Sequence, residues 1–274
     1  MSAGGPTGAD VGDRARVVIL TADGVEHRYV VNRLCLGLKI DGIVVDERVR
    51  LPSLRRAFRG GAAGGISRLA RELLRRAIRD AERREQALRR ILGEELTRDF
   101  IEQDRLVRVQ GVNSAEAIDA VADLRPDLLL VYGTSIVGDE MLEQARDVAL
   151  NLHTGISPFY RGTDCEFWPV VNREPERIGA TVHECTAAVD GGRIFATARA
   201  DWRKEDGLHE LFARAVAKGA DLYLETVRLY LESDLTGIPQ DLSAGREYRG
   251  HMRTLVPELK ARMLLRRGLL RQDR

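Results

Sequence analysis

The chain alternates short apolar runs with amphipathic stretches, and this rhythm limits the folds that it can adopt. Arg16–Leu20 and Ile40–Val45 are rich in β-branched and aliphatic residues, which is typical of buried strands. Between them, Glu26–Leu38 carries apolar residues at the spacing of one helix face. A strand, a helix and a second strand in this order favour a parallel sheet covered by helices.

The same rhythm resumes in the second half of the chain. Asn113 or Ser114 can cap a helix that ends at Leu124, with Glu116 in its first turn. The periodicity further predicts strands at Leu106–Val109, Leu128–Tyr132, Val148–His153, Ile178–Glu184 and Arg193–Ala200, and helices at Gly138–Arg146, Asp164–Val171 and Asp206–Glu232. The predicted fold is α/β, with a doubly wound and mostly parallel sheet.

The composition divides the chain into a core domain and three additions. Residues 14–232 are predicted to form the α/β domain, preceded by a flexible leader at 1–13. A helical insertion is predicted at about 52–104, and a helical extension with a basic amphipathic tail occupies 233–274.

The insertion is expected to begin with a loop and to continue as a helix. Pro52–Gly65 contains a proline and several glycines, whereas Ser67–Leu92 is arginine-rich with an apolar stripe. Acidic residues are interspersed with the arginines, so a solvated helix packed on the sheet is favoured over an RNA-binding helix.

The overall composition excludes several classes of protein. A hydrophobic content of 44% suffices for a sizeable core, and no apolar run is long enough to span a membrane. The net charge of +1 gives no reason to expect nucleic acid as a partner. Three scattered cysteines indicate a reducing cytoplasm and no disulfide framework, and no cluster with metal-ligand spacing is present, so no metal is expected.

Three polar residues in the second half have the chemistry of a catalytic site. Asn151 and His153 lie two positions apart on a predicted strand, so their side chains point to the same face. Asp190 follows at a turn between two predicted strands. An amide, an imidazole and a carboxylate suit a reaction that builds a negative oxygen and moves one proton.

The motifs around these residues resemble those of the folate-dependent formyltransferases. The resemblance is carried by Asn151-x-His153, by Ser157-Pro-x-Tyr-Arg-Gly162 and by Val189-Asp190-Gly. Val131-Tyr-Gly-Thr-Ser-Ile136 resembles the folate-pocket segment of that family. The resemblance is strong over residues 126–200 and implies a Rossmann-like formyltransferase core. It also implies N10-formyltetrahydrofolate as the formyl donor and Asn151, His153 and Asp190 as catalytic residues, with Asp190 favouring a protonated His153.

The resemblance also implies binding residues on both sides of the site. Folate-binding residues would be Gly133, Thr134, Ser135, Ile136, Val137, Thr186, Ala187 and Val189, although Ile136 and Val137 could equally cap the core. Acceptor-binding residues would be Tyr160, Arg161, Gly162 and Trp168. Trp168 is as compatible with a core position, and Arg161 could bind an anion or stabilise its own turn.

The acceptor is constrained by two absences. The first β–α junction, Thr21–His27, lacks the Gly-rich turn that cradles a phosphate in family members acting on glycinamide ribonucleotide. Only some forty residues follow Glu232, which argues against methionyl-tRNA as the acceptor. The expected acceptor is therefore a small-molecule amine, either an amino sugar on a nucleotide or a secondary-metabolite amine.

Two alternatives to a transferase remain open at this point. The same three residues could serve a formyltetrahydrofolate hydrolase with water as the acceptor, or the scaffold could be a non-catalytic binding protein. A homodimer is possible, because the arginine-rich helix and the C-terminal tail are both amphipathic.

Overall fold

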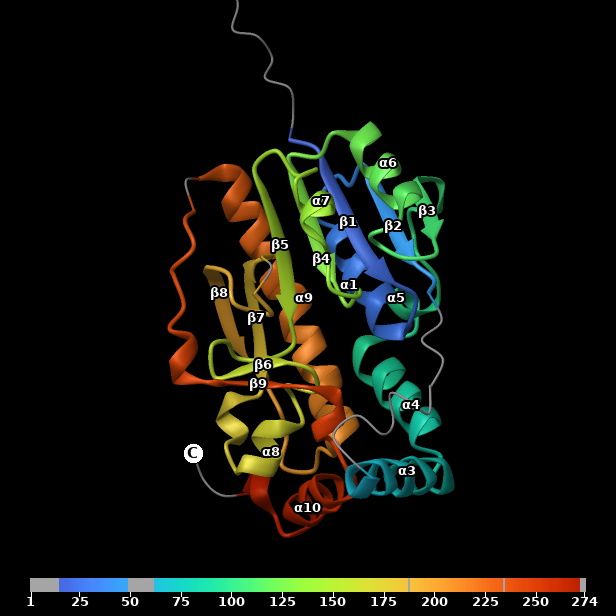
Figure 1. Cartoon of the computed structure of the whole chain (residues 1–274), viewed down its shortest axis with the longest axis vertical. Coiled ribbons are helices and arrows are strands. Elements are labelled where there is room, and N and C mark those ends of the chain that lie inside the picture. Colours follow the sequence, from blue (N-terminus) through green and yellow to red (C-terminus); the bar gives the residue numbers. More distant parts are fainter. Residues whose placement is uncertain (1–14, 49–61, 187, 234, 272–274) are drawn as a thin grey trace, which may run out of the picture.

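The computed structural model describes residues 15–48, 62–186, 188–233 and 235–271, with the side chains of residues 62–64 left out. The predicted leader at 1–13 lies outside the described residues. A sheet runs through the centre of the molecule, with helices packed against it (Figure 1). None of the helices in the described part of the chain is long and apolar enough to cross a membrane.

The central sheet has seven strands in the order β3-β2-β1-β4-β5-β7-β8. Its strands are β1 (Val17–Ala22), β2 (Gly42–Asp46), β3 (Leu106–Val109), β4 (Leu128–Tyr132), β5 (Val148–His153), β7 (Gly179–Glu184) and β8 (Ile194–Arg199). The first five strands are parallel, whereas β7 pairs with β5 and with β8 in antiparallel fashion. The predicted mostly parallel α/β sheet is confirmed.

Helices cover both faces because the strands are apolar on both sides. On β1, Val17 and Ile19 face one core, whereas Val18 and Leu20 face another. The first core is closed by α1 (Val25–Cys35), α4 (Asp80–Leu92) and α9 (Leu208–Glu232), and the second by α6 (Ala115–Leu124) and α7 (Asp139–Leu142). The predicted cap of α6 is present, since the Ser114 hydroxyl accepts the Ala117 N–H at 3.2 Å.

The arginine-rich insertion forms two helices where one long helix was predicted. The first, α3 (Ala62–Ala77), begins inside the segment predicted to be a loop, and the second is α4. Residues 52–61 of the predicted loop lie outside the described residues. Arg79 adopts a left-handed conformation with φ of 53° between them, which ends the first helix and turns the chain. The short helix α5 (Glu95–Arg98) follows α4 and packs against α1.

The C-terminal extension contains a predicted helix and an unpredicted strand. Helix α10 (Leu255–Arg266) begins where the basic amphipathic tail was expected. The strand β9 (Arg246–Tyr248) pairs in parallel with β6 (Tyr160–Gly162), forming a second, two-stranded sheet. Helix α8 (Trp168–Asn172) lies between this sheet and α10 (Figure 1).

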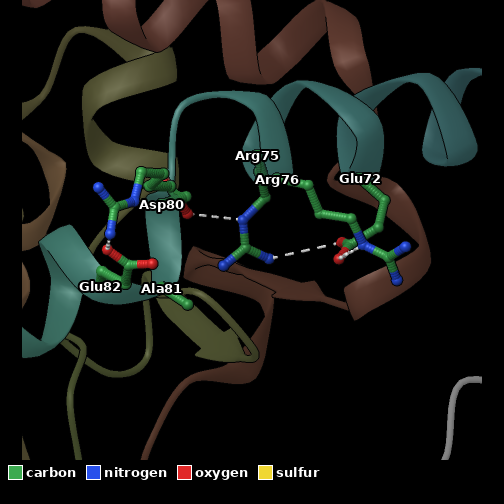
Figure 2. Close-up of a pocket in the computed structure, with 7 residues that line it drawn as sticks. Glu72, Arg75, Arg76, Asp80, Ala81 and Glu82 are labelled. Atoms are coloured by element: carbon green, nitrogen blue, oxygen red, sulfur yellow. Dashed lines mark hydrogen bonds and ion pairs between the residues drawn. The ribbon is translucent and has the colours of Figure 1, made fainter.

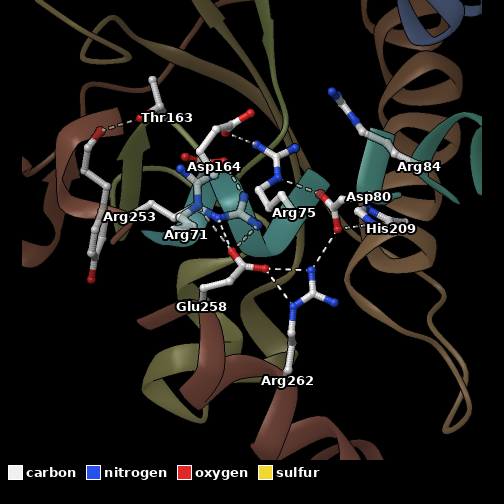
Figure 3. Close-up of polar contacts among 12 residues, drawn as sticks. Arg71, Arg75, Asp80, Arg84, Thr163, Asp164, His209, Arg253, Glu258 and Arg262 are labelled. Atoms are coloured by element: carbon white, nitrogen blue, oxygen red, sulfur yellow. Dashed lines mark hydrogen bonds and ion pairs between the residues drawn. The ribbon is translucent and has the colours of Figure 1, made fainter. Parts of the chain in front are cut away.

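Two buried carboxylates connect the insertion to the C-terminal helix. Asp80 is 2% exposed and Glu258 is fully buried, which is tolerated because both are ion-paired. Their partners are Arg75, His209 and Arg262 for Asp80, and Arg71, Arg253 and Arg262 for Glu258 (Figure 3). Burial raises the pKa of Asp80, but these hydrogen bonds and charges lower it more, so the carboxylate stays ionised.

Candidate active site

The sheet order places the candidate site at its topological switch point. Strand β1 lies between β2 and β4. The chain therefore continues from β1 to β2 on one side and from β4 to β5 on the other, so the two connections leave the carboxyl edge in opposite directions. Asn151 and His153 project from the adjacent strand β5, where Asn151 is paired with Val131 of β4. The pocket segment that begins at Gly133 therefore starts two residues from the partner of Asn151.

The structure brings the three predicted polar residues together around Asp190. Asp190 Oδ2 lies 3.4 Å from His153 Nδ1 and accepts the Gly162 N–H at 2.6 Å. Its other oxygen, Oδ1, lies 3.3 Å from His183 Nε2, which is 3.1 Å from the Asn151 amide nitrogen. The Nε2 atom of His183 thus lies within reach of both the Asn151 amide and the Asp190 carboxylate.

His183 is a site residue that sequence reasoning missed. It is 2% exposed and lies opposite Asn151 in the antiparallel pairing of β7 with β5. Its Nδ1 is 2.8 Å from the Glu184 carbonyl oxygen, which fixes the orientation of the ring. The only signal in the sequence was a histidine inside an otherwise apolar predicted strand. The antiparallel register that sets this histidine opposite Asn151 cannot be read from the residues around it.

The charges of the site favour an ionised Asp190. Burial raises the pKa of Asp190, but His153, His183 and the Gly162 N–H together hold it well below its usual range. Burial lowers the pKa of His153 below 6.5, and this effect exceeds the opposing influence of Asp190. Asp190 thus favours the protonated form of His153, whereas burial opposes it more strongly.

His153 is nevertheless placed to hold a second proton. Its Nε2 is 2.9 Å from the Tyr160 carbonyl oxygen, and its Nδ1 faces Asp190. Both ring nitrogens thus face oxygen acceptors, so the protonated ring would donate on both sides. This geometry suits a group that is neutral at rest and takes up a proton during a reaction.

The backbone at Gly162 requires the absence of a side chain. Gly162 has φ of 94°, and a Cβ there would lie 2.1 Å from the Tyr248 carbonyl oxygen. The glycine therefore allows β6 and β9 to approach closely while its N–H reaches Asp190.

The predicted folate-pocket segment follows β4 and has mixed exposure. Gly133 has φ of 69°, and a Cβ there would collide with the His27 ring. Thr134 bonds the Ser135 carbonyl, and the Ser135 hydroxyl lies 3.3 Å from Asp46. The Ile136 side chain is 73% exposed at this edge.

Val137 differs from Ile136, because its side chain is buried in the core beneath the segment. Any contact of Val137 with a ligand would therefore be through its backbone.

The opposite side of the expected pocket is only partly described. Thr186 is exposed, its hydroxyl 3.4 Å from the Ala188 carbonyl oxygen, and Ala187 lies outside the described residues. The Val189 carbonyl oxygen lies 3.5 Å from the Arg161 guanidinium. Arg161 also reaches the Leu242 carbonyl at 3.5 Å, so it bridges two backbone segments near the site.

Two of the predicted acceptor-binding side chains lie in the core. Tyr160 is 2% exposed, its ring stacks on Tyr248, and its hydroxyl donates to Glu174 at 2.6 Å. Trp168 is 6% exposed, stacks on Tyr248 and belongs to the same buried cluster. Packing thus supports the core position for Trp168 and leaves neither ring a free face for an acceptor.

Burial disfavours the thiolate form of the two cysteines near the site. Burial raises the pKa of the Cys185 thiol to about 12 and that of Cys165 well above its ordinary value. No group of histidine, cysteine and carboxylate side chains suited to a metal is found among the residues described.

A cavity of about 250 Å³ lies elsewhere, between α3 and α4 (Figure 2). It is lined by Arg75, Arg76, Arg79, Glu72, Asp80, Glu82 and Ala81. Its arginines are paired with its own carboxylates, as in the contact of Arg75 with Asp80 at 2.6 Å. With its charges neutralised internally and none of the candidate residues in its lining, this cavity is not the active site.

Sequence comparison assigns the chain to a family. The sequence model of the formyl transferase family matches residues 79–227, more than half of the chain. The chain therefore belongs to the formyl transferase family. A methionyl-tRNA formyltransferase from Chlorobium chlorochromatii is 32% identical over 133 residues, which make up 48% of this chain and 42% of that protein. The chain spans less than half the length of the curated relatives that it matches.

Solved structures share the fold over most of the chain. A sugar N-formyltransferase from a Shewanella species has a TM-score of 0.56 and 12% identity, covering 90% of this chain and 86% of that one. HypX from Aquifex aeolicus, solved in complex with tetrahydrofolic acid, has a TM-score of 0.53 and 10% identity, covering 92% of this chain and 34% of that one. At these identities the likeness shows a common fold.

Proposed function

We propose that the protein transfers a formyl group from N10-formyltetrahydrofolate to a primary amine of a small molecule. The proposal rests on the position of Asp190 between two buried imidazoles, next to the Asn151 amide and at the carboxyl edge of the sheet. This arrangement combines a donor for a developing oxyanion with a base for one proton. Membership of the formyl transferase family supports it.

Asn151 supplies the donor for the oxyanion. The amine nitrogen attacks the formyl carbon, and the C=O electron pair moves onto oxygen. One N–H of the Asn151 amide bonds His183, which leaves the second N–H for this oxygen. A donor of this kind contributes about 100- to 1,000-fold to kcat.

His153 and Asp190 handle the proton. Asp190 takes one proton from the attacking nitrogen and passes it to Nδ1 of neutral His153, and the carboxylate then stabilises the imidazolium that forms. The bond between the formyl carbon and N10 then breaks, and the proton passes to N10. The products are a formamide and tetrahydrofolate, so no further reactant is needed.

The edge of the sheet fits the formyl donor. The exposed Ile136 side chain follows the turn at Gly133, which offers an apolar surface beside backbone polar groups. That combination suits the flat ring of a pterin. HypX, which was solved with tetrahydrofolic acid, shares the fold and supports this assignment. Thr134, Ser135, Val137, Thr186, Ala187 and Val189 remain proposed folate ligands on the resemblance.

The first β–α junction supports an acceptor without a phosphate at this position. The Asp23 carboxylate is bonded to Arg28 at 2.7 Å and to Arg108 at 3.0 Å, so both cations are already paired. The His27 ring packs against Gly24 at the start of α1 and leaves no glycine-rich cradle there. An amino sugar on a nucleotide is the leading acceptor, supported by the shared fold of the sugar N-formyltransferase over 90% of this chain.

Methionyl-tRNA is the second candidate acceptor. The observation that favours it is the 32% identity to a methionyl-tRNA formyltransferase over 133 residues. This match covers 48% of the chain, so it does not by itself select the acceptor. We also propose residues 14–232 as the catalytic domain and 233–274 as its extension, since the family match at 79–227 falls inside the former.

The test uses the purified full chain, N10-formyltetrahydrofolate and a panel of acceptors. The panel contains nucleotide-linked amino sugars, free amino sugars, other primary amines and methionyl-tRNA. Tetrahydrofolate formation that requires a small amine, with a product heavier by one formyl group, supports the proposal. Rapid formate release without any acceptor would instead identify a hydrolase, and formylation of methionyl-tRNA alone would select the second candidate. Absence of all three reactions would leave a binding protein.

A further inference from the structure

A C-terminal segment outside the family match crosses the catalytic turns. Residues 235–248, here called the strap, run past β8 to β9 (Figure 1). Ile194 and Ile238 exchange two backbone hydrogen bonds of 2.8 Å, and Arg246 donates its N–H to the Phe159 carbonyl at 3.0 Å. The strap is thus fixed to the β7–β8 hairpin at one end and to the turn before β6 at the other.

Gln240, within the strap, holds the turn that carries Asp190. Its side-chain Nε2 donates to the Asp190 carbonyl oxygen at 3.0 Å and also contacts the Gly192 carbonyl oxygen. Asp190 has φ of 48°, in the left-handed region that few residues other than glycine, asparagine and aspartate adopt. The Gln240 amide therefore ties the two carbonyls on either side of this tight turn.

We infer that Gln240 is a positioning residue, which sets the place of the Asp190 carboxylate through its backbone. The inference rests on the proposed formyl transfer. The strap holds Asp190 from a second direction as well, because the Thr163 N–H donates to Tyr248 at 2.8 Å beside Gly162, whose N–H binds the Asp190 carboxylate. Both restraints on Asp190 therefore depend on residues beyond α9.

The amide group of Gln240 is chemically specific for this task. An amide nitrogen carries two N–H groups, one for each carbonyl, whereas a carboxylate or a thioether carries none. The Gln240 Oε1 atom is buried and accepts no hydrogen bond from any described residue. The hydrogen bonds of the Gln240 side chain are therefore all made by its nitrogen, and they must offset the free-energy cost of burying an oxygen without a donor.

Gln240→Met removes both donors with little change in volume. Released from its tie, the turn would let Asp190 retreat from His153, and a displacement of about 1 Å costs roughly 100-fold in rate. We expect kcat to fall about 10- to 100-fold, with a smaller change in the KM for the formyl donor, since of the proposed folate ligands only those before Asp190 belong to the tied turn. Gln144→Met is the matched control, because Gln144 makes the same kind of bond, an exposed one to the Glu140 carbonyl at 2.9 Å, in the segment that follows α7.

The pH profile separates positioning from a merely structural role. His153 is faced by Asp190, which raises its pKa, and by His183 and Arg161, which lower it. Loss of contact with Asp190 would therefore shift the acid limb of kcat to lower pH in Gln240→Met. The side chain in Gln240→Asn is one methylene shorter, so its amide reaches one carbonyl at most and the loss of kcat should be intermediate. This variant tests the inference if Gln240→Met does not fold.

A readout independent of activity keeps the inference distinct from the proposed function. Histidine-selective NMR of the wild type and of Gln240→Met should show shifted imidazole resonances for His153 and His183, with those of His251 unchanged. Activity within 2-fold of the wild type, or an unmoved acid limb with unshifted resonances, would overturn the inference. If the wild type shows no formyl transfer, the proposed function fails, and the NMR comparison alone decides the role of Gln240.

Discussion

Replacing Asp190 by Asn removes the central charge of the site with almost no change in shape. Asp190 Oδ2 and His153 Nδ1 are 3.4 Å apart, so their attraction, once His153 is protonated, is about 5 kcal/mol at an effective dielectric constant of about 20. About 1.4 kcal/mol corresponds to a factor of ten in rate, and the Asn dipole offsets part of the loss. We therefore expect Asp190→Asn to lower kcat by about 100- to 1,000-fold.

The assay for this variant is the initial rate of tetrahydrofolate formation across a range of pH. His153 must be neutral to accept a proton, so the wild-type rate should fall as pH drops through the pKa of His153. Burial lowers that pKa and Asp190 raises it. Without Asp190 the pKa of His153 falls further, and the acid limb moves to lower pH.

The control for this experiment is Asp241→Asn, which changes an exposed carboxylate bonded to Ser243 in the strap. It should keep kcat within about 2-fold of the wild type. A loss below about 10-fold in Asp190→Asn, together with an unmoved acid limb, would refute the proton-transfer role.

Three further changes test the site and the ion pairs that join the insertion to the C-terminal helix. Gly162→Ala should abolish activity and lower Tm, because the added Cβ would lie 2.1 Å from a backbone carbonyl oxygen of the strap; Gly93→Ala, with a similar φ of 89° but open space, should cost only about 1–2 kcal/mol. Asp80→Ala should lower the free energy of unfolding at pH 7 by about 3–5 kcal/mol in urea titrations, whereas Glu82→Ala on the surface should change it by less than about 1 kcal/mol. Because the pKa of Asp80 is lowered on folding, its contribution is full above its unfolded value of about 3.9 and should decline progressively as pH falls from there towards the lower folded pKa; an equal loss at all pH values would contradict this. His183→Phe should reduce kcat about 10- to 100-fold in initial-rate assays, and wild-type kcat would show that this imidazole has no role.

The parallel core could be predicted because its strands and helix caps are determined by residues that are close together in the sequence. Strands β3 and β4 begin and end where the apolar runs do, and the Ser114 cap of α6 follows from one side chain and one N–H. The failure at Arg79 has an equally local cause, since helix periodicity continues across a residue whose backbone is left-handed. An arginine gives no signal for such a conformation.

The remaining features of the site depend on contacts between distant segments. His183 becomes meaningful only through the antiparallel register that sets it opposite Asn151. The burial of Tyr160 depends on Tyr248, from a strand that pairs with β6 across more than eighty residues. Periodicity within a short window cannot reveal such pairings, whereas a motif in the order Asn151, His153, Asp190 identified residues that the fold then brought together.

Transfer of an isotopic label tests the central claim most directly. The wild type is incubated with N10-formyltetrahydrofolate labelled with ¹³C in the formyl group and with a nucleotide-linked amino sugar, and the products are analysed by mass spectrometry. The site geometry around Asp190 predicts that the amine gains one labelled formyl group for each tetrahydrofolate formed, and that Asp190→Asn greatly slows this transfer. Label recovered only as free formate, at a rate independent of the amine, would contradict formyl transfer.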